Sequence, residues 1–329
     1  YYMKYGLGKG WMGILFAVLM IITFGFAYNS VQSNTICLAW QKAFGIEPAT
    51  MGIVLTALTL LIIFGGIQRV AKFSSTVVPV MAVVYLLIAV GVVVWNIASL
   101  PKVLLAIVEN AFGFNQAAGG VLGVTVIQGI KRGLFSNEAG EGSAPNAAAV
   151  ATVSHPVKQG LIQALGVFTD TLVVCSCTAF IILVSGVDVT ASNGIQLTQD
   201  ALTHEIGSIG NPFVAVMIWL FAFSSIIGNY YYGETNVRYI RDSKLGVFIY
   251  RLAVAAMVMV GAVVSLDFAW SFADITMALL TLCNLVAIVL LSRQAVFLLQ
   301  DYRQQKKEGK NPVFSKDKMP EIADKLEAW

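Results

Sequence analysis

Two stripes of polar and aromatic side chains run along long apolar segments of this chain. The first stripe holds Phe24, Tyr28 and Gln32, and the second holds Phe221, Ser225 and Asn229, each spaced four residues apart. Residues at that spacing share one face of a helix. A polar group in a lipid-embedded helix either bridges to another helix or contacts a solute. A ring with two polar groups on one face favours the binding of a small zwitterionic solute, and bridging between helices remains the alternative.

The second stripe also carries two adjacent hydroxyls. Ser224 directly precedes Ser225, and oxygen ligands suit a hard cation such as sodium. Neighbouring serines are common in helices, so the pair is weak evidence by itself. We treat both serines as candidate sodium ligands.

The stretch from Gly133 to Ala149, GLFSNEAGEGSAPNAAA, interrupts the apolar pattern with small and polar residues, among them Glu138 and Glu141. Irregular backbone at membrane depth occurs only where it is buried in protein or lines a watery cavity. Such a break beside a membrane helix is typical of a solute path, and a cytosolic loop that starts a new helix is the alternative. From the charge placement below, we expect the stretch at the cytoplasmic end, one or two turns from the solute, with Asn137 and Glu138 at an inner gate.

Two aspartates fall inside apolar segments. Asp170 lies near the middle of Val157 to Leu183, and an intramembrane carboxylate marks a functional site by default. It could bind a cation, relay a proton or pair with a donor on another helix, and Thr169 and Thr171 could instead satisfy it locally. Asp274, near the outer end of the last apolar segment, fits an external gate or a helix cap.

These residues are set in a chain that is too apolar for a soluble domain. Of its 329 residues, 57% are hydrophobic and 12% are charged, and the mean hydropathy is +0.77. Apolar runs of about 20 residues, the length that crosses a bilayer, recur along it. We expect an all-α integral membrane protein with about eight transmembrane helices, and a shorter interfacial helix over residues 104–112. The expected spans are Trp11–Ala39, Met51–Gly66, Val77–Ile97, Ala118–Ile130, Val157–Leu183, Pro212–Tyr232, Phe248–Leu266 and Phe272–Leu291.

Most basic residues lie in alternate connections between these segments, and the other connections are nearly free of them. The basic groups are Arg69 and Lys72; Lys131, Arg132 and Lys158; Arg238, Arg241 and Lys244; and those from Arg293 to Lys310, whereas residues 185–211 contain none. The positive-inside rule places all of these groups in the cytoplasm. Glu138 and Glu141 could anchor Lys131 or Arg132 there. We expect one transmembrane domain over residues 1–299 and a cytoplasmic tail over residues 300–329.

Catalytic motifs that would indicate an intramembrane enzyme are absent from the sequence. It contains no HExxH, no GxSxG and no paired intramembrane aspartates. The four cysteines lie in apolar segments and match neither a zinc spacing nor a disulfide framework. We expect neither an enzyme nor a nucleic-acid-binding protein.

The stretch from Gly133 to Ala149, followed by FTDTLVVC at residues 168–175, closely resembles the alanine or glycine:cation symporter family of bacteria and archaea. The likeness extends over nearly the whole chain and includes residues 1–8, Asn29 to Asn34, Ala273-Asp274 and residues 311–314. The resemblance implies sodium-driven uptake of alanine or glycine across a prokaryotic cell membrane. It also implies the LeuT-type fold of two inverted five-helix repeats, with the solute near the midplane.

The resemblance implies the following site residues. Gln32, Ile127, Gln128, Gly129, Ser225 and Asn229 match solute-facing positions, and Ser224 and Ser225 match hydroxyls that hold sodium. Phe24 joins the solute contacts because it shares the stripe of Gln32, and Asn137, Glu138, Asp170 and Asp274 are expected to act in gating or coupling. Asn229 departs from relatives that carry tryptophan, and Gln128 from relatives that carry an aromatic, so the side-chain preference stays open.

The family begins with three helices that we do not find in this chain, including a broken helix that supplies part of both sites. We therefore expect this chain to be N-terminally truncated and inactive by itself. One alternative is a sodium- or proton-coupled carrier of another neutral amino acid such as glutamine. A channel, or a sensor that does not transport, is another. Nothing in the sequence indicates an oligomeric state.

Overall fold

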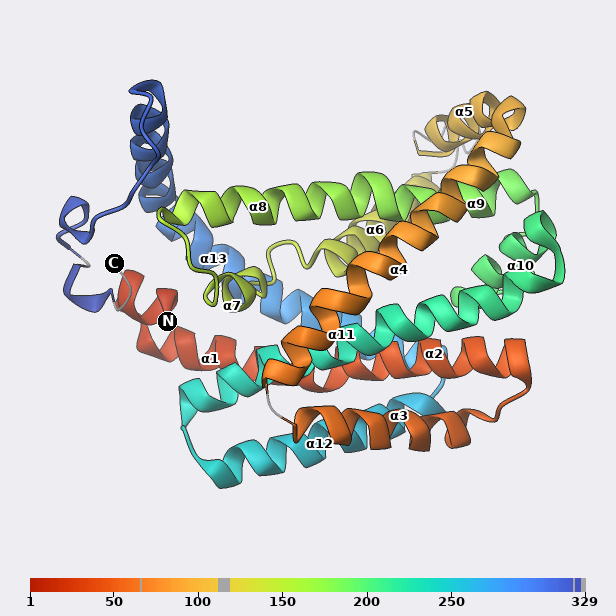
Figure 1. The fold of residues 1–329 in the computed structure, drawn as a ribbon, viewed down its shortest axis with the longest axis horizontal. Coiled ribbons are helices and arrows are strands. Elements are labelled where there is room, and N and C mark those ends of the chain that lie inside the picture. The colour runs from red at the N-terminus through yellow and green to blue at the C-terminus, as the bar shows by residue number, and fades with distance from the viewer. Residues whose placement is uncertain (66, 112–118, 322, 327–329) are drawn as a thin grey trace.

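In the computed structural model, which describes residues 1–65, 67–111, 119–321 and 323–326, every regular element is a helix (Figure 1). The α-helices are α1 (Gly10–Met20), α2 (Asn29–Phe44), α3 (Pro48–Ile63), α4 (Ile67–Trp95), α5 (Leu100–Ala111), α6 (Gly119–Asn137), α7 (Ala144–Ala148), α8 (Pro156–Thr169), α9 (Ser176–Ser185), α10 (Ile195–Ile206), α11 (Gly210–Ile240), α12 (Lys244–Val263) and α13 (Leu266–Lys307). Short π-helical segments are η1 (Tyr2–Gly6), η2 (Ile21–Tyr28) and η4 (Asp170–Cys175), and 3-10 segments are η3 (Ile97–Ser99), η5 (Gly207–Ile209), η6 (Lys316–Lys318) and η7 (Ala323–Lys325).

The apolar segments expected from the sequence coincide with these helices and the short turns that join them; Gly66, Phe112 and Ala118 lie outside the described residues. Five helical stretches of the described chain are long and apolar enough to cross a membrane, or six if the pair Pro79–Trp95 and Ile97–Ala111, bent by 70°, counts as one. The expected number of about eight is therefore too high by this measure. One reason is that α3 has only 16 residues. The LeuT-type fold and the absence of three family helices are not confirmed.

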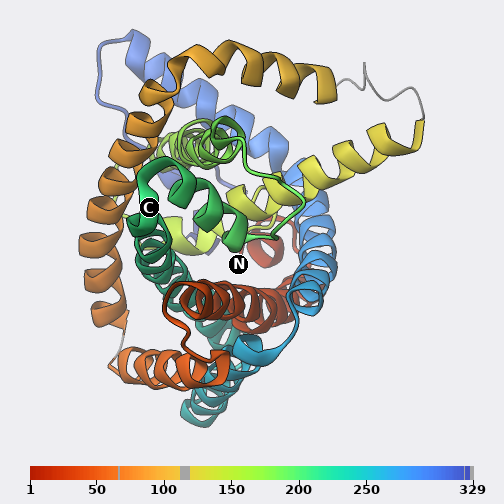
Figure 2. The ribbon, with the colours of Figure 1, turned by 90° about the vertical axis from the view of Figure 1, so that its right-hand side faces the viewer.

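Two long helices form the centre of the bundle. α11 lies against α2, and α12 packs on both α2 and α3. The stretch from Gly10 to Phe44 is one continuous rod, because η2 joins α1 to α2 without a break. α13 runs along α1 and η2, whereas α4 and α10 pack on α11, and α9 packs on α4 and α10. Figure 2 shows α4 along one side of the bundle, with α5 bent away from its end.

Polar side chains and a glycine join α2 to α12. Ser33 Oγ donates to the Val258 carbonyl oxygen at 2.6 Å, and Asn34 Nδ2 donates to the carbonyl oxygens of Gly261 and Val264 at 3.0 and 2.8 Å. A Cβ at Gly261 would lie 2.5 Å from Ser30 Cα, so only glycine allows this close approach. The part of the Asn29 to Asn34 segment on this face thus bridges helices. We call the contact of Ser30, Ser33 and Asn34 with α12 the α2–α12 seam.

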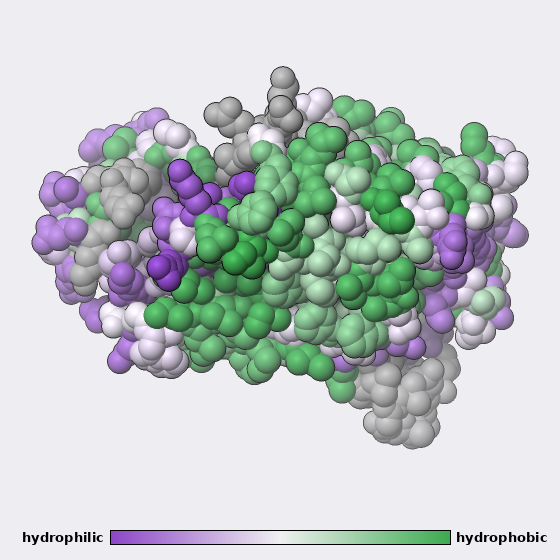
Figure 3. All heavy atoms as spheres, turned by 90° about the horizontal axis from the view of Figure 1, so that it is seen from below, coloured by the Kyte–Doolittle hydropathy of each residue, from purple (hydrophilic) through white to green (hydrophobic). Residues whose placement is uncertain are grey.

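The outer surface matches a membrane protein. Large apolar side chains of several helices are exposed, including Ile53 and Leu61 on α3 and Phe248 and Ile249 on α12. In Figure 3 the middle of one face is apolar, and hydrophilic residues gather toward both ends of the long axis. This band, together with the candidate spans, identifies a multi-pass membrane protein.

One group of basic residues is not where the charge rule places it. Lys131 and Arg132 on α6 pair with Asp274, at 3.2 and 2.5 Å. Asp274 lies near the start of α13, about 48 Å along the helix axis from Lys306 at its end. Lys158, by contrast, donates to Asn311 of the tail. The prediction that Lys131, Arg132 and Lys158 share one side of the membrane is therefore wrong in this structure.

The tail folds back onto the end of the bundle. α13 continues past residue 299, where we expected the tail to begin, and ends at Lys307. The Phe314 backbone N–H donates to the Ser154 carbonyl oxygen at 2.9 Å, and the buried His155 ring contacts Asp301 at 3.2 Å. The division into a transmembrane domain and a cytoplasmic tail stays a prediction.

Candidate functional site

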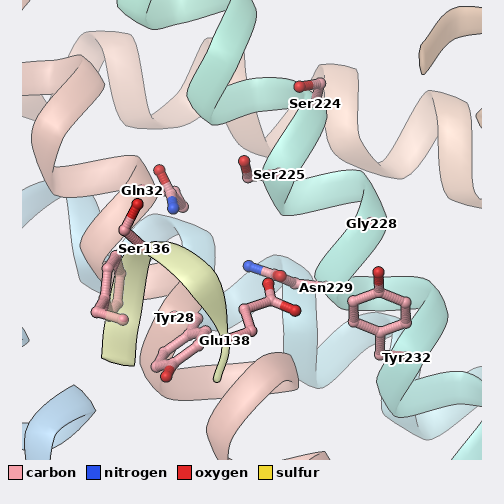
Figure 4. A pocket seen from close by; sticks show the side chains of 10 residues that line it. Tyr28, Gln32, Ser136, Glu138, Ser224, Ser225, Gly228, Asn229 and Tyr232 are labelled. Carbon is pink, nitrogen blue, oxygen red and sulfur yellow. The ribbon is translucent and has the colours of Figure 1, made fainter. Parts of the chain in front are cut away.

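A polar cavity of about 410 Å³ lies between α2, α11 and the end of α6 (Figure 4). Its volume falls within the range of small-molecule pockets. Tyrosine, amide, hydroxyl and carboxyl groups line it alongside one phenylalanine and one glycine. The lining residues are Tyr28, Gln32, Phe135, Ser136, Glu138, Ser224, Ser225, Gly228, Asn229 and Tyr232.

The stretch that interrupts the apolar pattern forms one wall of this cavity. α6 ends at Asn137 and α7 begins at Ala144, and the residues between them, 138–143, are not helical. We call residues 138–143 the break. Glu138, with a φ of 50°, and Gly142, with a φ of 83°, adopt left-handed backbone conformations that reverse the chain direction locally. A Cβ at Gly142 would lie 2.7 Å from Phe16 Cζ, so a larger residue here would have to displace the Phe16 ring.

The break lies deep in the bundle rather than at its end. Glu141 Oε1 accepts a hydrogen bond of 2.7 Å from the Tyr28 hydroxyl, which is near the middle of the rod from Gly10 to Phe44. Asn284 Nδ2, from the interior of α13, donates to the Gly140 carbonyl oxygen at 2.7 Å. The expectation that this stretch lies at the cytoplasmic end, below the solute, is therefore wrong. Irregular backbone at this depth is buried or lines the cavity, as the membrane requires.

Glu138 and Glu141 occupy different environments within the break. Glu138 lines the cavity, whereas Glu141 is fully buried behind Tyr28. Neither carboxyl anchors Lys131 or Arg132 as proposed from the sequence, because both cations pair with Asp274. The break thus presents one carboxyl to the cavity and buries a second one beside it.

Three residues predicted to contact solute come together at this cavity. Gln32 reaches it from α2, and Ser225 and Asn229 reach it from α11 (Figure 4). The four-residue spacing explains this arrangement, because it puts Ser225 and Asn229 on the same face of α11. Phe24 does not line the cavity. It is fully buried and packs edge-on against Tyr28 and Tyr232, with ring centroids 4.9 and 5.3 Å away.

The predicted sodium ligands also lie at this wall. The hydroxyls of Ser224 and Ser225 both donate to the Phe221 carbonyl oxygen, at 2.7 and 3.1 Å. With its proton committed to the backbone, each hydroxyl oxygen keeps lone pairs for a cation. The pair thus suits a cation that is held by oxygen atoms.

The α6 residues Ile127, Gln128 and Gly129 lie away from the cavity. All three are exposed, and Ile127 has 54% of its surface accessible. The cavity meets α6 two turns later, at Phe135 and Ser136. The prediction that residues 127–129 face the solute is therefore wrong for this structure. The predicted fourth span stopped at Ile130, whereas α6 continues to Asn137.

Asp170 and Asn137 connect the cavity wall to the helix behind it. Ser136 lines the cavity and donates its hydroxyl proton to Asp170 Oδ2 at 2.6 Å. Thr171 donates to Asn137 Oδ1 at 2.5 Å. The local alternative for Asp170 is not observed, because Thr169 donates instead to the Leu165 carbonyl oxygen. Asp170 thus pairs with a donor on another helix. It does not line the cavity itself but contacts Ser136, which does.

Asp274 forms a charged cluster away from the cavity. Besides its two ion pairs, the Arg132 guanidinium stacks over the Trp270 ring, 4.1 Å from the ring centroid. The cluster links α6 to the start of α13, which agrees with a gating or coupling position and rules out a simple helix cap. Its gating role stays a prediction.

Several lining residues escaped the sequence-based site. Tyr28 was on the first stripe but was not selected, and Tyr232 lies three residues after Asn229, so it extends the second stripe by one turn. Ser136 lies inside the polar stretch from Gly133 to Ala149, so the sequence could have identified it as a lining residue. The role of Glu141 depends on its contact with Tyr28, which is 113 positions earlier in the chain, and no local pattern encodes that contact.

The comparisons with known proteins agree with a carrier. Residues 1–316 match the model of the sodium:alanine symporter family. The chain is 54% identical to the probable sodium/glutamine symporter GlnT of Bacillus subtilis over 96% of this chain and 66% of that protein. It is 50% identical to the amino-acid carrier protein AlsT of the same organism, over 100% of this chain and 70% of that protein. It is 35% identical to the sodium/alanine symporter AgcS of Methanococcus maripaludis, over 93% of this chain and 68% of that protein.

The chain spans about two thirds of the length of these relatives. The family is named for sodium:alanine symport, and these relatives are named as symporters or as an amino-acid carrier, which confirms the expectation of a carrier rather than an enzyme. The match also covers the break and the three helices that line the cavity, α2, α6 and α11. The chain therefore belongs to the sodium:alanine symporter family.

Proposed function

We propose that the protein takes up a small neutral amino acid, alanine or glycine, together with sodium by alternating access. One observation carries the proposal: a polar cavity at mid-depth, between α2, α11 and the broken connection from α6 to α7. Carriers of the LeuT type bind solute near the midplane beside discontinuous helices. The break from Asn137 to Ala144 fits that pattern and supports a LeuT-type fold of two inverted repeats.

The cavity lining offers a partner for each end of an amino acid. The Glu138 carboxyl complements the solute's ammonium, and the Gln32 and Asn229 amides can donate to its carboxylate. Desolvating a zwitterion is costly, so fixed polar groups must replace its water shell. Sodium held at Ser224 and Ser225 adds positive charge to the same wall. Solute and sodium then raise each other's affinity, because binding coupling is reciprocal.

We place the protein in the cell membrane of a prokaryote, with the tail in the cytoplasm. The support comes from Arg238, Arg241, Lys244 and the basic residues near the end of α13, which follow the positive-inside rule. The paired cations Lys131 and Arg132 do not count toward the positive-inside rule, because Asp274 neutralises part of their charge.

The proposal is tested by uptake into proteoliposomes that contain the protein expressed from its complete reading frame. We expect labelled alanine or glycine to accumulate only under an inward sodium gradient, and the rate to saturate with solute. Accumulation without sodium would contradict sodium coupling. A rate that rises linearly with solute would indicate a channel, and specific binding without accumulation would indicate a sensor.

Glutamine is the second candidate solute. Asn229 and Gln32 add amide groups to the cavity that could bind a side-chain amide, and the 54% identical relative is named a probable sodium/glutamine symporter. Asn229→Trp should fill part of the 410 Å³ cavity and lower glutamine uptake at least about tenfold relative to glycine. Competition assays with unlabelled alanine, glycine and glutamine measure this ratio. An unchanged ratio would mean that Asn229 does not select the side chain.

A further inference from the structure

Glu141 is a buried acid to which neither solute nor sodium binding assigns a role. This residue has no accessible surface, although it carries an ionisable carboxyl. Its Oε1 accepts the 2.7 Å hydrogen bond from Tyr28, whereas its Oε2 has no hydrogen-bond partner among the described residues. A buried carboxylate with one oxygen unpaired is costly, and a neutral carboxyl is much less so. The environment therefore favours Glu141 with a proton on Oε2.

Among the described residues, the groups that face Glu141 do not supply a compensating positive charge. Tyr28 on η2 contributes a neutral hydroxyl, and Asn284 on α13 contributes an amide that is committed to Gly140. Phe16 on α1 packs on the adjacent Gly142. The charged group near Glu141 is Glu138 in the break, and Asp274 on α13 acts on Tyr28; both are acidic. The cations Lys131 and Arg132 are held by Asp274.

Glu141 is nevertheless connected to the cavity. Tyr28 lines the cavity with part of its surface and donates its hydroxyl proton to Glu141. Glu138, three residues earlier in the break, also lines the cavity. A solute that displaces Tyr28 or the break therefore changes the surroundings of Glu141. When water reaches this site, the ionised carboxylate becomes accessible, because water replaces the missing partner of Oε2.

We propose that Glu141 is a proton-binding site that loads and releases one proton during each transport cycle. In the occluded arrangement a proton from water in the cavity is held on Oε2. Opening of the cavity lets that proton return to water and leaves the carboxylate, with Tyr28 still donating to Oε1. No other bond forms or breaks. This inference rests on the proposed transport function, because the cycle supplies the alternation of wet and dry states.

The first test measures proton movement directly. A pH-sensitive dye is enclosed in proteoliposomes that contain the protein, and amino acid is added under a fixed sodium gradient. We expect uptake to change the internal pH in the wild type, and Glu141→Gln to take up amino acid with no proton movement. Glutamine keeps the size of the side chain and an acceptor for Tyr28. Proton movement that persists in Glu141→Gln, or wild-type uptake without any, would overturn the proposal.

Tyr28→Phe provides a second variant that keeps the carboxyl. Loss of the Tyr28 donor destabilises the carboxylate form, so we expect the midpoint of the pH profile of uptake to move to higher pH, while Glu141→Gln shows a flat profile. If Glu141→Gln instead loses its dependence on sodium and keeps its pH profile, Glu141 binds sodium and the proton site is wrong.

Infrared spectroscopy separates this inference from the proposed function. A protonated buried carboxyl gives a C=O stretching band that a carboxylate lacks, and the band is measurable in protein that does not transport. We expect the band in the wild type and its loss in Glu141→Gln. The band without any uptake would contradict the transport function and leave the proton site supported, and uptake without the band would overturn the proton site alone.

Discussion

Two polar regions of the bundle interior, the α2–α12 seam and the cavity, contain similar residues but have different roles. At the α2–α12 seam, Ser33 and Asn34 donate to backbone oxygens of α12. At the cavity, Gln32 lies on the same helix one residue earlier, yet it faces the space beside Ser225 and Asn229. Polarity inside the membrane therefore does not by itself distinguish a bridge from a binding site.

The packing around each region makes the distinction. The seam brings two helices so close that Gly261 meets the Ser30 backbone, and no room for solute remains. At the break, helical hydrogen bonding stops between Asn137 and Ala144, which leaves space and exposes polar groups to it. In a regular helix pair, the polar groups thus hydrogen-bond to the partner helix. In an interrupted helix they stay available for a ligand.

The largest expected effect is a loss of folding stability when the α2–α12 seam is disrupted. In Gly261→Val the new Cβ would lie 2.5 Å from Ser30 Cα and 2.6 Å from the Ser30 carbonyl oxygen, so α2 and α12 must separate. We expect a loss of about 3 kcal/mol in the free energy of unfolding, and little folded protein after extraction. Gly91→Val on α4 is the matched control, because a Cβ at that position would enter open space. Similar thermal unfolding and size-exclusion profiles for both variants would refute the close approach.

The next largest effect should show that the geometry of the break matters more for transport than for folding. Gly142→Ala places a Cβ 2.7 Å from Phe16 Cζ, in a backbone conformation with a φ of 83°. The left-handed conformation costs alanine about 1–2 kcal/mol, so residues 138–143 must shift while the seam stays packed. We expect uptake to fall at least about tenfold, and the thermal unfolding temperature to fall much less than in Gly261→Val. Normal uptake would show that the geometry of the break is not needed for transport.

A pair of serine variants compares the two regions directly. Ser225→Ala removes one oxygen from the cavity wall, and we expect the sodium concentration for half-maximal uptake to rise about tenfold, which corresponds to about 1.4 kcal/mol. Ser33→Ala removes the 2.6 Å bond to Val258. It should lower the free energy of unfolding by about 0.6 kcal/mol and leave the sodium response unchanged. Equal sodium responses in the two variants would remove Ser225 from the sodium site.

The sequence was sufficient for the class of protein and for part of the site. Hydropathy identified the helices, and the four-residue spacing brought Ser225 and Asn229 to one wall with Gln32 across from them. The break was recognised but placed at the wrong depth, because Lys131 and Arg132 were treated as free cytoplasmic charges. Their partner Asp274 is 142 residues away from Arg132 in the chain, and the positive-inside rule contains no term for such pairing. Family resemblance misplaced Ile127 to Gly129 for a related reason: the end of α6 depends on what it packs against.

The smallest expected effect tests the finding that residues 127–129 lie away from the cavity. Gln128 is exposed on α6, two turns before the helix reaches the cavity at Phe135 and Ser136. Gln128→Ala should therefore leave the solute concentration for half-maximal uptake within about twofold of the wild type, since surface changes away from a site are nearly neutral. Ser136→Ala is the informative partner, because Ser136 lines the cavity and holds Asp170 at 2.6 Å; its half-maximal concentration should rise severalfold. If Gln128→Ala has the larger effect, the solute lies along α6 as the family resemblance implied, and the break only supports it.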